Sequence, residues 1–157
     1  MIEVKFVKTH PDAQLPKRSH ESYVRTEGVG LVQLITGDTG YDVFSVEDVV
    51  IKSRGSSVVK TGIDVAFVDP GYWFLVLPRS GLGFKYGLQP HIGVIDNSFR
   101  GNCSVKLYNF SEEDYTIRKG DRIAQLVFYP LIEANIEWAE SISPTNRGEK
   151  GFGSTGK

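Results

Sequence analysis

The stretch Cys103-Ser104-Val105-Lys106-Leu107-Tyr108-Asn109 alternates apolar and polar side chains with a period of two. This alternation is typical of a β-strand that buries one face and exposes the other. Short runs rich in β-branched and aromatic residues lie on both sides of it. These runs predict further strands at 4–8, 42–45, 49–52, 57–60, 63–67, 73–77, 93–95, 115–117, 123–128 and 135–138.

Turn sequences separate these runs. The chain has 17 Gly and 7 Pro, with clusters such as Asp69-Pro70-Gly71 and Lys119-Gly120-Asp121. Many short strands with regular turns predict an all-β sandwich, jelly roll or small barrel. No segment sustains a helical period, so we expect residues 82–87 to hold one helical turn at most.

Length and charge set the class of protein. A chain of 157 residues and 17.5 kDa is expected to form one domain with an ordinary core. Its formal net charge of -1 provides no broad basic surface for nucleic acid or an anionic membrane. The sequence starts without a signal-peptide pattern and contains no apolar run long enough to cross a bilayer, which favours an intracellular, cytoplasmic protein.

The thiol and imidazole side chains do not indicate a metal centre. The single cysteine, Cys103, excludes an internal disulfide and is expected to be a small core residue rather than a nucleophile. The three histidines, His10, His20 and His91, lack the spacing of metal ligands, so a structural zinc site is not expected.

Two segments fall outside the strand pattern. Residues 18–38 are polar and contain glycine, which indicates a surface loop or an added hairpin; a partner-binding element is the less favoured interpretation. Residues 141–157 are rich in Pro, Gly and Ser and are expected to form a flexible C-terminal arm beyond a core of residues 1–140.

The end of the arm carries an anion-binding pattern. Residues 151–157 satisfy G-x-x-x-x-G-K, but a P-loop also needs a following Ser or Thr and a helix, so we do not expect one. Glycine backbone N–H groups, with the hydroxyls of Ser154 and Thr155 and the charge of Arg147, can still surround a phosphate. Phe152 can stack on a base. An arm that closes over a polyphosphate and a disordered tail are both compatible with this stretch.

Four further segments place polar residues at strand ends. Taken singly, each has an ordinary explanation: Gln125 as a satisfied core amide, Asp42 or Asp96 as a turn-capping carboxylate. The segments are Thr39-Gly40-Tyr41-Asp42-Val43-Phe44-Ser45, Pro78-Arg79-Ser80-Gly81-Leu82, Gly93-Val94-Ile95-Asp96-Asn97-Ser98-Phe99-Arg100-Gly101 and Gly120-Asp121-Arg122-Ile123-Ala124-Gln125-Leu126-Val127-Phe128.

Together with the arm, and in this order, these segments resemble the five motifs of the homotrimeric dUTPase (dUTP diphosphatase) family. The resemblance extends from Thr39 to Gly156. It implies a distorted jelly-roll β-barrel, the dUTPase-like β-clip, assembled as a homotrimer. Each active site would then take segments from all three subunits, and the C-terminal arm would close over it.

The resemblance also implies the reaction. Members of the family convert dUTP and water to dUMP and diphosphate, which limits uracil in DNA and supplies dUMP for dTMP synthesis, and Mg²⁺ arrives chelated by the triphosphate. Asp96 matches the aspartate that orients or deprotonates the attacking water. Ser80 and Gln125 match residues that contact the polyphosphate, and Arg79 matches the arginine that balances its charge. Asp42 matches an aspartate that contacts the Mg²⁺ hydration shell, with no direct protein ligand expected.

The remaining contacts implied by the resemblance select the nucleotide. Phe99 stands where the family usually has tyrosine and would pack on the deoxyribose, excluding a 2′-hydroxyl. Phe152 would stack on uracil, and a short hairpin at 88–93 would read the base through its backbone. The γ-phosphate would be held by Arg147, Gly153, Ser154 and Thr155, and the other substrate-contacting positions are Gly81, His91, Ile92, Gly93, Ile95 and Lys106.

Two other functions stay open at this point. A dCTP deaminase or bifunctional relative would carry a catalytic glutamate in the strand after the third motif, where this chain has Val105, Lys106 and Leu107. A regulatory binding protein could keep the fold without turnover. Nucleotide binding without diphosphate release would distinguish the regulatory protein.

Overall fold

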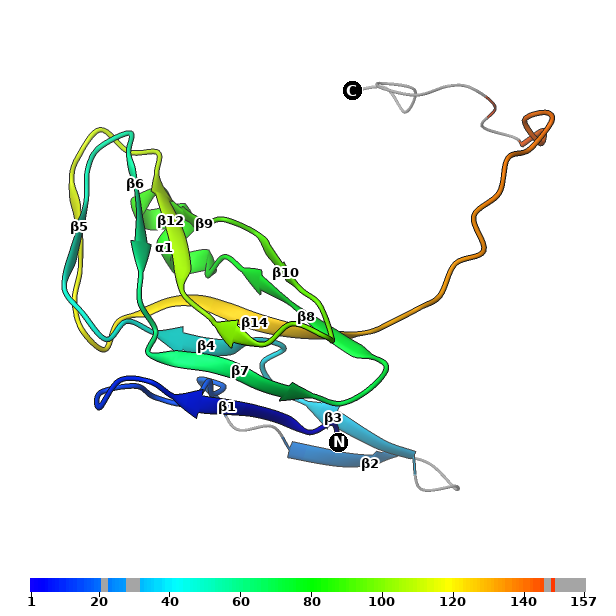
Figure 1. The fold of residues 1–157 in the computed structure, drawn as a ribbon, viewed down its shortest axis with the longest axis horizontal. Helices are drawn as coiled ribbons and strands as arrows, with labels where there is room; N and C mark the ends of the chain where they lie inside the picture. Colours follow the sequence, from blue (N-terminus) through cyan, green and yellow to red (C-terminus); the bar gives the residue numbers. More distant parts are fainter. Residues whose placement is uncertain (21–22, 28–31, 146–147, 149–157) are drawn as a thin grey trace.

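The computed structural model describes residues 1–20, 23–27, 32–145 and 148, and its described part is almost entirely β. The only helix within these ranges, α1 (Ser80–Tyr86), lies between β8 and β9 (Figure 1). The strands are β1 (Val4–Lys8), β2 (Tyr23–Glu27), β3 (Val32–Thr36), β4 (Tyr41–Phe44), β5 (Val49–Ile51), β6 (Ser56–Val59), β7 (Ile63–Val68), β8 (Tyr72–Leu77), β9 (Leu88–Pro90), β10 (Gly93–Ile95), β11 (Gly101–Asn102), β12 (Val105–Asn109), β13 (Tyr115–Ile117) and β14 (Arg122–Pro130).

Five small antiparallel sheets build a jelly-roll-like fold. A four-stranded sheet with the order β10-β8-β14-β4 packs beside two three-stranded sheets, β1-β7-β11 and β6-β12-β9. The pairs β13-β5 and β2-β3 complete the set. Neighbours in these sheets are often far apart in sequence, as where β14 lies between β4 and β8. Such crossings between sheets are expected in a jelly roll and confirm the all-β prediction.

The core forms where the alternating strands turn their apolar faces inward. On β12, Val105 and Leu107 are buried while Lys106 between them is exposed, as the alternation predicts. Phe74, Ile123 and Leu126 from the four-stranded sheet are fully buried against them. Cys103 is also a buried core residue, and burial raises the pKa of its thiol to about 11. Both predictions for Cys103, a core position and no role as a nucleophile, fit this environment.

Helix α1 is longer than the one turn expected from the sequence. It runs over seven residues and ends at Gly87, whose φ of 67° is left-handed. A Cβ at Gly83 would lie 2.6 Å from Nε2 of Gln89, so glycine lets the helix approach β9 closely. The helix buries no residue fully, and two of its seven residues are glycine, so it leaves no amphipathic period to detect.

Two other local predictions are wrong. No strand forms at 135–138, where Ile136 and Trp138 are exposed and the chain runs away from the barrel (Figure 1). None of the strands in the described ranges pairs with these apolar residues. Residues 88–93 are not a hairpin of paired strands either, because β9 pairs with β12 whereas β10 pairs with β8.

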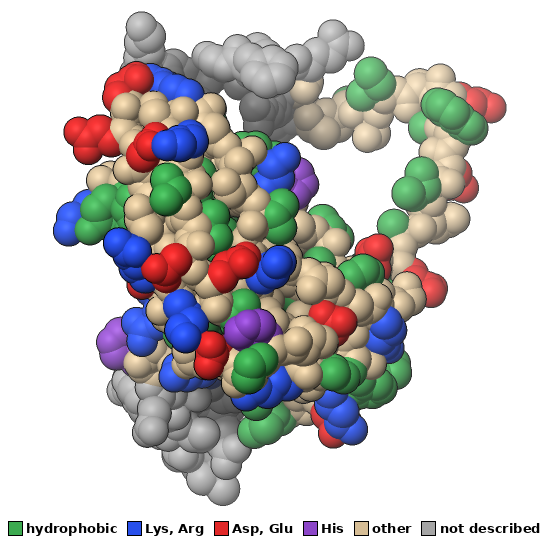
Figure 2. Space-filling view, turned by 60° about the vertical axis from the view of Figure 1, so that its left-hand side comes forward, with side chains coloured by type: hydrophobic (Ala, Val, Ile, Leu, Met, Phe, Trp, Pro, Cys, Tyr) green, Lys and Arg blue, Asp and Glu red, His purple; other side chains and the backbone are tan. Residues whose placement is uncertain are grey.

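Residues 18–38 contain the antiparallel pair β2–β3, which is the hairpin alternative for this segment. Tyr23 lies opposite Thr36 at its base and Glu27 opposite Val32 farther out. Figure 2 shows positive and negative side chains mixed over the face turned toward the reader. Among the described residues, no helix has the length and hydropathy needed to cross a lipid bilayer.

Candidate active site

A polar cavity of about 310 Å³ lies where β4, β14 and the junction between β8 and α1 meet. The sheet order brings them together, because Gln125 on β14 lies opposite Asp42 on β4 and opposite Leu77 at the end of β8. The cavity is lined by Asp42, Arg79, Ser80, Gly81 and Gln125, which the sequence predicted as site residues, and by Ser19, His20, Asp38, Thr39 and Gly40.

Asp42 is the centre of a charged network under this cavity. Its side chain is almost fully buried, and Nε of Arg79 donates to Oδ1 at 2.7 Å. The Oγ of Ser19 donates to Oδ2 at 2.7 Å, and Nε of Arg122 lies 3.4 Å from the same oxygen. A buried carboxylate needs such partners to remain charged. The network fixes the direction of the Arg79 guanidinium.

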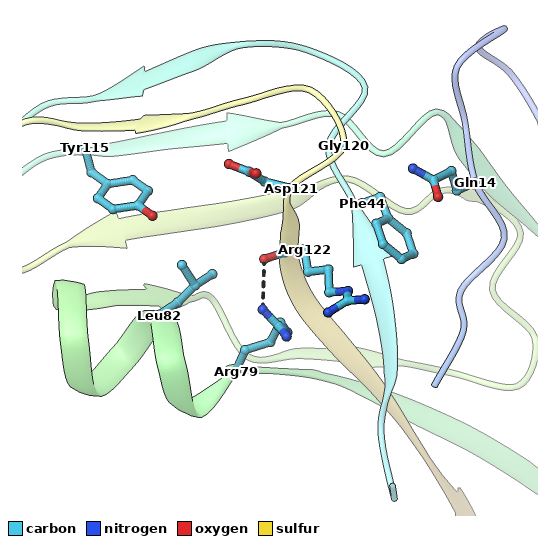
Figure 3. A pocket seen from close by; sticks show the side chains of 8 residues that line it. All are labelled: Gln14, Phe44, Arg79, Leu82, Tyr115, Gly120, Asp121 and Arg122. Carbon is cyan, nitrogen blue, oxygen red and sulfur yellow. Dashed lines mark hydrogen bonds between the residues drawn. The ribbon is translucent and has the colours of Figure 1, made fainter. Parts of the chain in front are cut away.

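Arg79 lines the polar cavity and also a second cavity of about 410 Å³, whose lining residues Figure 3 shows. Figure 3 shows its side chain reaching from the start of α1 toward β14, where Nη1 donates to the backbone oxygen of Arg122 at 3.4 Å. Arg122 lies within one of the motif segments, but its sequence position alone predicts no role for it. Its contact with Asp42 depends on the pairing of β14 with β4, which no local pattern reveals.

Ser80 and Gly81 begin helix α1 at the edge of the polar cavity and are exposed. Arg79 precedes them with extended backbone angles, φ −92° and ψ 132°, and its carbonyl accepts the N–H of Gly83 at 3.1 Å. The strand-to-helix change therefore places a guanidinium and a hydroxyl side by side at the end of β8.

The side chain of Gln125 packs closely against Gly40, the residue before β4. Its Nε2 donates to the carbonyl oxygen of Pro78 at 2.9 Å, which ties β14 to the residue before Arg79. A Cβ at Gly40 would lie 2.6 Å from Cδ of Gln125 and would displace the amide. Gly40 is thus a position that sequence reasoning missed: the space it provides is visible only once β4 and β14 are paired.

Asp96 lies at the other end of the four-stranded sheet, exposed in the turn after β10. The turn is held by Asn97, whose Nδ2 donates to the carbonyl oxygens of Asp69 and Tyr72, at 2.7 Å each. The N–H of Phe99 donates to the carbonyl oxygen of Asp96 at 3.0 Å, which closes the turn with the partly exposed Phe99 ring beside it. Asn97 thus fixes the turn that carries Asp96, a contact that no local sequence pattern reveals.

The predicted base-reading segment adjoins β12. The N–H of His91 donates to the carbonyl oxygen of Lys106 at 2.7 Å, and Nζ of Lys106 lies 5.3 Å from the ring centre of Tyr108. Ile92 is exposed next to them. Gly93 and Ile95 extend the segment along β8, opposite Val76 and Phe74. His91, Ile92 and Lys106 thus form an exposed group separate from the polar cavity.

Within one chain, Asp96 in the turn after β10 lies far from the polar cavity. Ile95 pairs with Phe74, so Asp96 is level with Trp73, six residues before Arg79 along β8. At about 3.3 Å per residue of extended chain, Asp96 and Arg79 are separated by roughly 20 Å. One copy of the chain therefore does not bring Asp96 to Ser80 and Gln125.

Five predicted site residues, Arg147, Phe152, Gly153, Ser154 and Thr155, lie outside the described residues. The described part of the segment leading to them, residues 131–145, arches away from the barrel (Figures 1 and 2). In the described ranges, no three His, Cys, Asp or Glu side chains gather into a group that could hold a metal ion.

Proteins of known family that are similar in sequence to this chain belong to the family that the motifs resemble. The family model dUTPase matches residues 33–156. A deoxyuridine 5′-triphosphate nucleotidohydrolase of Eremothecium gossypii is 38% identical over 154 residues, which cover 97% of this chain and 95% of that protein. One of Paramecium bursaria Chlorella virus 1 is 46% identical over 120 residues, 76% of this chain and 84% of that protein.

Solved structures give the same result. The dUTPase of Staphylococcus bacteriophage 80alpha with dUpNHpp superimposes with a TM-score of 0.81 at 30% identity, over 99% of both chains. The fold, the five residues at the polar cavity and the match over residues 33–156 lead to one conclusion. This chain belongs to the dUTPase family.

Proposed function

We propose that this protein hydrolyses dUTP to dUMP and diphosphate in a homotrimer, by attack of water on the α-phosphorus. The observation that carries the proposal is the meeting of Asp42, Arg79, Ser80, Gly81 and Gln125 at one polar cavity. These residues come from three of the family's motifs, and they meet only because β14 pairs with both β4 and β8.

The cavity suits a polyphosphate. Arg79 supplies a guanidinium that Asp42 holds in place at 2.7 Å, Ser80 an exposed hydroxyl, and Gln125 a primary amide. Phosphoryl transfer depends mainly on positioning and on stabilising the negative charge of the leaving group. The cation and the two neutral donors are therefore assigned to the phosphates rather than to a covalent step.

The proposed role of Asp96 is to orient the water and accept its proton. Because Asp96 lies about 20 Å from Arg79 along its own sheet, this role requires the Asp96 of another copy. The exposed Ile132, Ile136 and Trp138 on the segment that leaves the barrel support an assembly, since another copy would cover them. A ring of three copies would satisfy every cavity in the same way.

The residues at the cavity fit a Mg²⁺ ion that arrives with the triphosphate. Mg²⁺ in such sites typically contacts one or two carboxylates and the substrate phosphates while keeping several waters. Asp42 lines the cavity and is assigned to the hydration shell of the ion. When bound, the ion would neutralise phosphate charge. The protein residues orient the phosphates and the attacking water.

Selection of the nucleotide is assigned to the exposed group around β10 and β12. The ring of Phe99, held beside Asp96 by the turn hydrogen bond, would pack on the deoxyribose and leave no space for a 2′-hydroxyl. The backbone of residues 88–93, joined to Lys106 through His91, would read uracil. Arg147, Phe152, Gly153, Ser154 and Thr155 are proposed to close the site from the C-terminal arm, residues 141–157.

The test is diphosphate release with Mg²⁺ from dUTP, dCTP, dTTP and UTP at equal concentrations. Release from dUTP alone is expected. Release from several nucleotides would contradict the assigned selection by Phe99 and the 88–93 segment but keep the chemistry. Ammonia release from dCTP would instead reveal a deaminase, and binding of dUTP without release would reveal a regulatory protein.

A further inference from the structure

The hairpin β2–β3 is attached to the barrel at the wall of the polar cavity. Ser19 and His20 precede the hairpin and Asp38 follows it, and all three side chains line the cavity with Arg79, Ser80 and Gln125. None of the three has a role in the reaction described above. A polyphosphate in this cavity would therefore lie next to these three side chains on the hairpin side.

Asp38 and His20 are hydrogen-bonded to each other across the base of the hairpin. The backbone N–H of His20 donates to Oδ2 of Asp38 at 2.8 Å, and Nδ1 of its ring lies 3.0 Å from the same oxygen and 3.2 Å from Oδ1. The backbone hydrogen bond, together with the ring, holds the pKa of Asp38 below its usual range. Asp38 is therefore a carboxylate at neutral pH, which can only accept, so Nδ1 carries the proton.

This arrangement determines what the other ring nitrogen can do. Nδ1 is used by Asp38, while the imidazole as a whole is 82% exposed. A neutral ring would present the lone pair of Nε2 to phosphate oxygens, which is unfavourable. A protonated ring would instead present an N–H and a positive charge.

The charges around the cavity favour the same state. Asp42 is neutralised by Arg79 and Arg122, which leaves Asp38 as the carboxylate that would repel a polyphosphate. A protonated His20 removes that repulsion and adds a donor. A neutral His20 does neither.

We propose that His20 is a further polyphosphate-contacting residue, which donates Nε2–H to a phosphate oxygen as an imidazolium, and that Asp38 is its positioning residue. The proposal rests on the proposed function of the cavity as the polyphosphate site. It gives the base of the inserted hairpin a part in substrate binding. It also predicts that binding takes up a proton at pH 7.5, since histidine changes charge between about pH 5 and pH 8.

Calorimetry of dUpNHpp binding with Mg²⁺ at pH 7.5, in two buffers of different ionisation enthalpy, measures that proton. The wild-type protein is expected to take up part of a proton. His20→Gln keeps a donor but cannot titrate, so it should lose this uptake and bind about fivefold more weakly. His20→Arg keeps a fixed charge and should bind within about twofold of wild type without the uptake. Equal affinity and equal uptake in wild type and His20→Gln would overturn the proposal.

Steady-state kinetics provide a second readout. His20→Gln should raise KM for dUTP about fivefold and leave kcat within about twofold, because the contact is made in the ground state as well as in the transition state. His10→Gln and Asp114→Asn are matched controls and should leave both constants unchanged. His10 is another histidine outside the cavity, and Asp114 is an exposed carboxylate that similarly joins a cation, Lys52, to a backbone N–H.

Failure of this inference can be told apart from failure of the proposed function. Inorganic triphosphate with Mg²⁺ probes the cavity without the nucleoside. If the wild-type protein does not hydrolyse dUTP but takes up a proton with inorganic triphosphate, and His20→Gln does not, the His20 contact stands. If dUTP is hydrolysed and neither ligand distinguishes the variants, His20 makes no such contact. Thermal unfolding of each variant controls for folding, and His20→Arg and Asp38→Asn remain as tests if His20→Gln does not fold.

Discussion

Nε of Arg79 lies 2.7 Å from Oδ1 of Asp42; Asp42 is on β4, and Arg79 follows β8 at the start of α1, so the two residues come from either side of β14. The contact crosses a strand to which neither residue belongs. It therefore reports whether β8, β14 and β4 are correctly assembled beneath the cavity.

Asp42→Asn is expected to lower both stability and activity. It removes the charge that Arg79 and Arg122 share, and Arg79 is partly buried, so the unfolding free energy should fall by about 2 kcal/mol. With Arg79 no longer fixed, kcat/KM for dUTP should fall about 100-fold. Urea unfolding and steady-state kinetics measure the two effects. Asp114→Asn, which breaks an exposed pair with Lys52, should change the unfolding free energy by less than about 0.5 kcal/mol.

Gly40→Ala is expected to act through Gln125. The new Cβ would occupy the place of the Gln125 amide, so kcat/KM should fall about tenfold or more. If displacement of that amide is the cause, Gly40→Ala should have little further effect in a Gln125→Ala background. A double-mutant cycle measures this coupling, and simple additivity would show that Gly40 acts elsewhere.

Asp96→Asn should bind dUpNHpp but not turn over dUTP, because the amide keeps the shape of the carboxylate and cannot accept the proton of water. Ser80→Ala should be strongly impaired for a different reason, the loss of a phosphate contact.

Mixed trimers of these two variants test whether sites are shared between copies. Since Asp96 and Ser80 would come from different subunits, co-refolding the variants at equal amounts should restore about a quarter of the wild-type activity by random assortment. A mixture as inactive as its components would mean that each chain supplies both residues to its own site.

Removal of residues 141–157 should leave a folded trimer with severely reduced activity. The buried core residues of the described ranges all precede this segment, and the described part of the segment is exposed. Light scattering and the nucleotide assay of the truncated chain check the two halves of this expectation. Dissociation into monomers on truncation would show instead that the segment holds the assembly together.

Cys103 makes the stability of the fold sensitive to alkali. Burial raises the pKa of its thiol from 9.0 to about 11, so between these values the unfolded chain ionises and the folded chain does not. The contribution to stability is fully present below pH 9 and is lost as the pH rises through 11, in total about 3 kcal/mol. Cys103→Ala should show a flatter dependence of unfolding free energy on pH over this interval, measured by urea unfolding. Parallel curves for the two proteins would contradict the assigned burial effect.

The strands could be predicted because their signal is local. The bounds of β1, β10 and β13 agree with the sequence prediction, and Cys103 and Leu107 are buried where the alternation places them. Helix α1 was predicted as one turn at most because two of its seven residues are glycine and interrupt the helical period; of these, Gly83 serves contact with β9. The apolar residues at 135–138 did suggest a strand, but an alternation cannot say whether a pairing partner exists in the same chain.

The site residues likewise fall into those that the sequence motifs predict and those that depend on strand pairing. The motif residues Asp42, Arg79, Ser80 and Gln125 were found from the sequence, and the structure brings them to one cavity. The parts played by Arg122 and Gly40 depend on which strands β14 joins, and that pairing spans residues far apart in the chain. The order of residues in the sequence does not show which distant strands pair.

The way β2–β3 joins the barrel offers an engineering route. His20 and Asp38 lie 2.8 Å apart through a backbone donor, so the chain leaves the barrel and returns to it at nearly the same point. The two ends of any segment inserted between them are therefore already held together. The entropic cost of closing a loop there grows only slowly with the length of the loop. A foreign module, such as a fluorescent reporter or an epitope, could be grafted there without lengthening any strand. Because Ser19, His20 and Asp38 line the cavity, a fluorescent module attached there would lie close to a bound nucleotide.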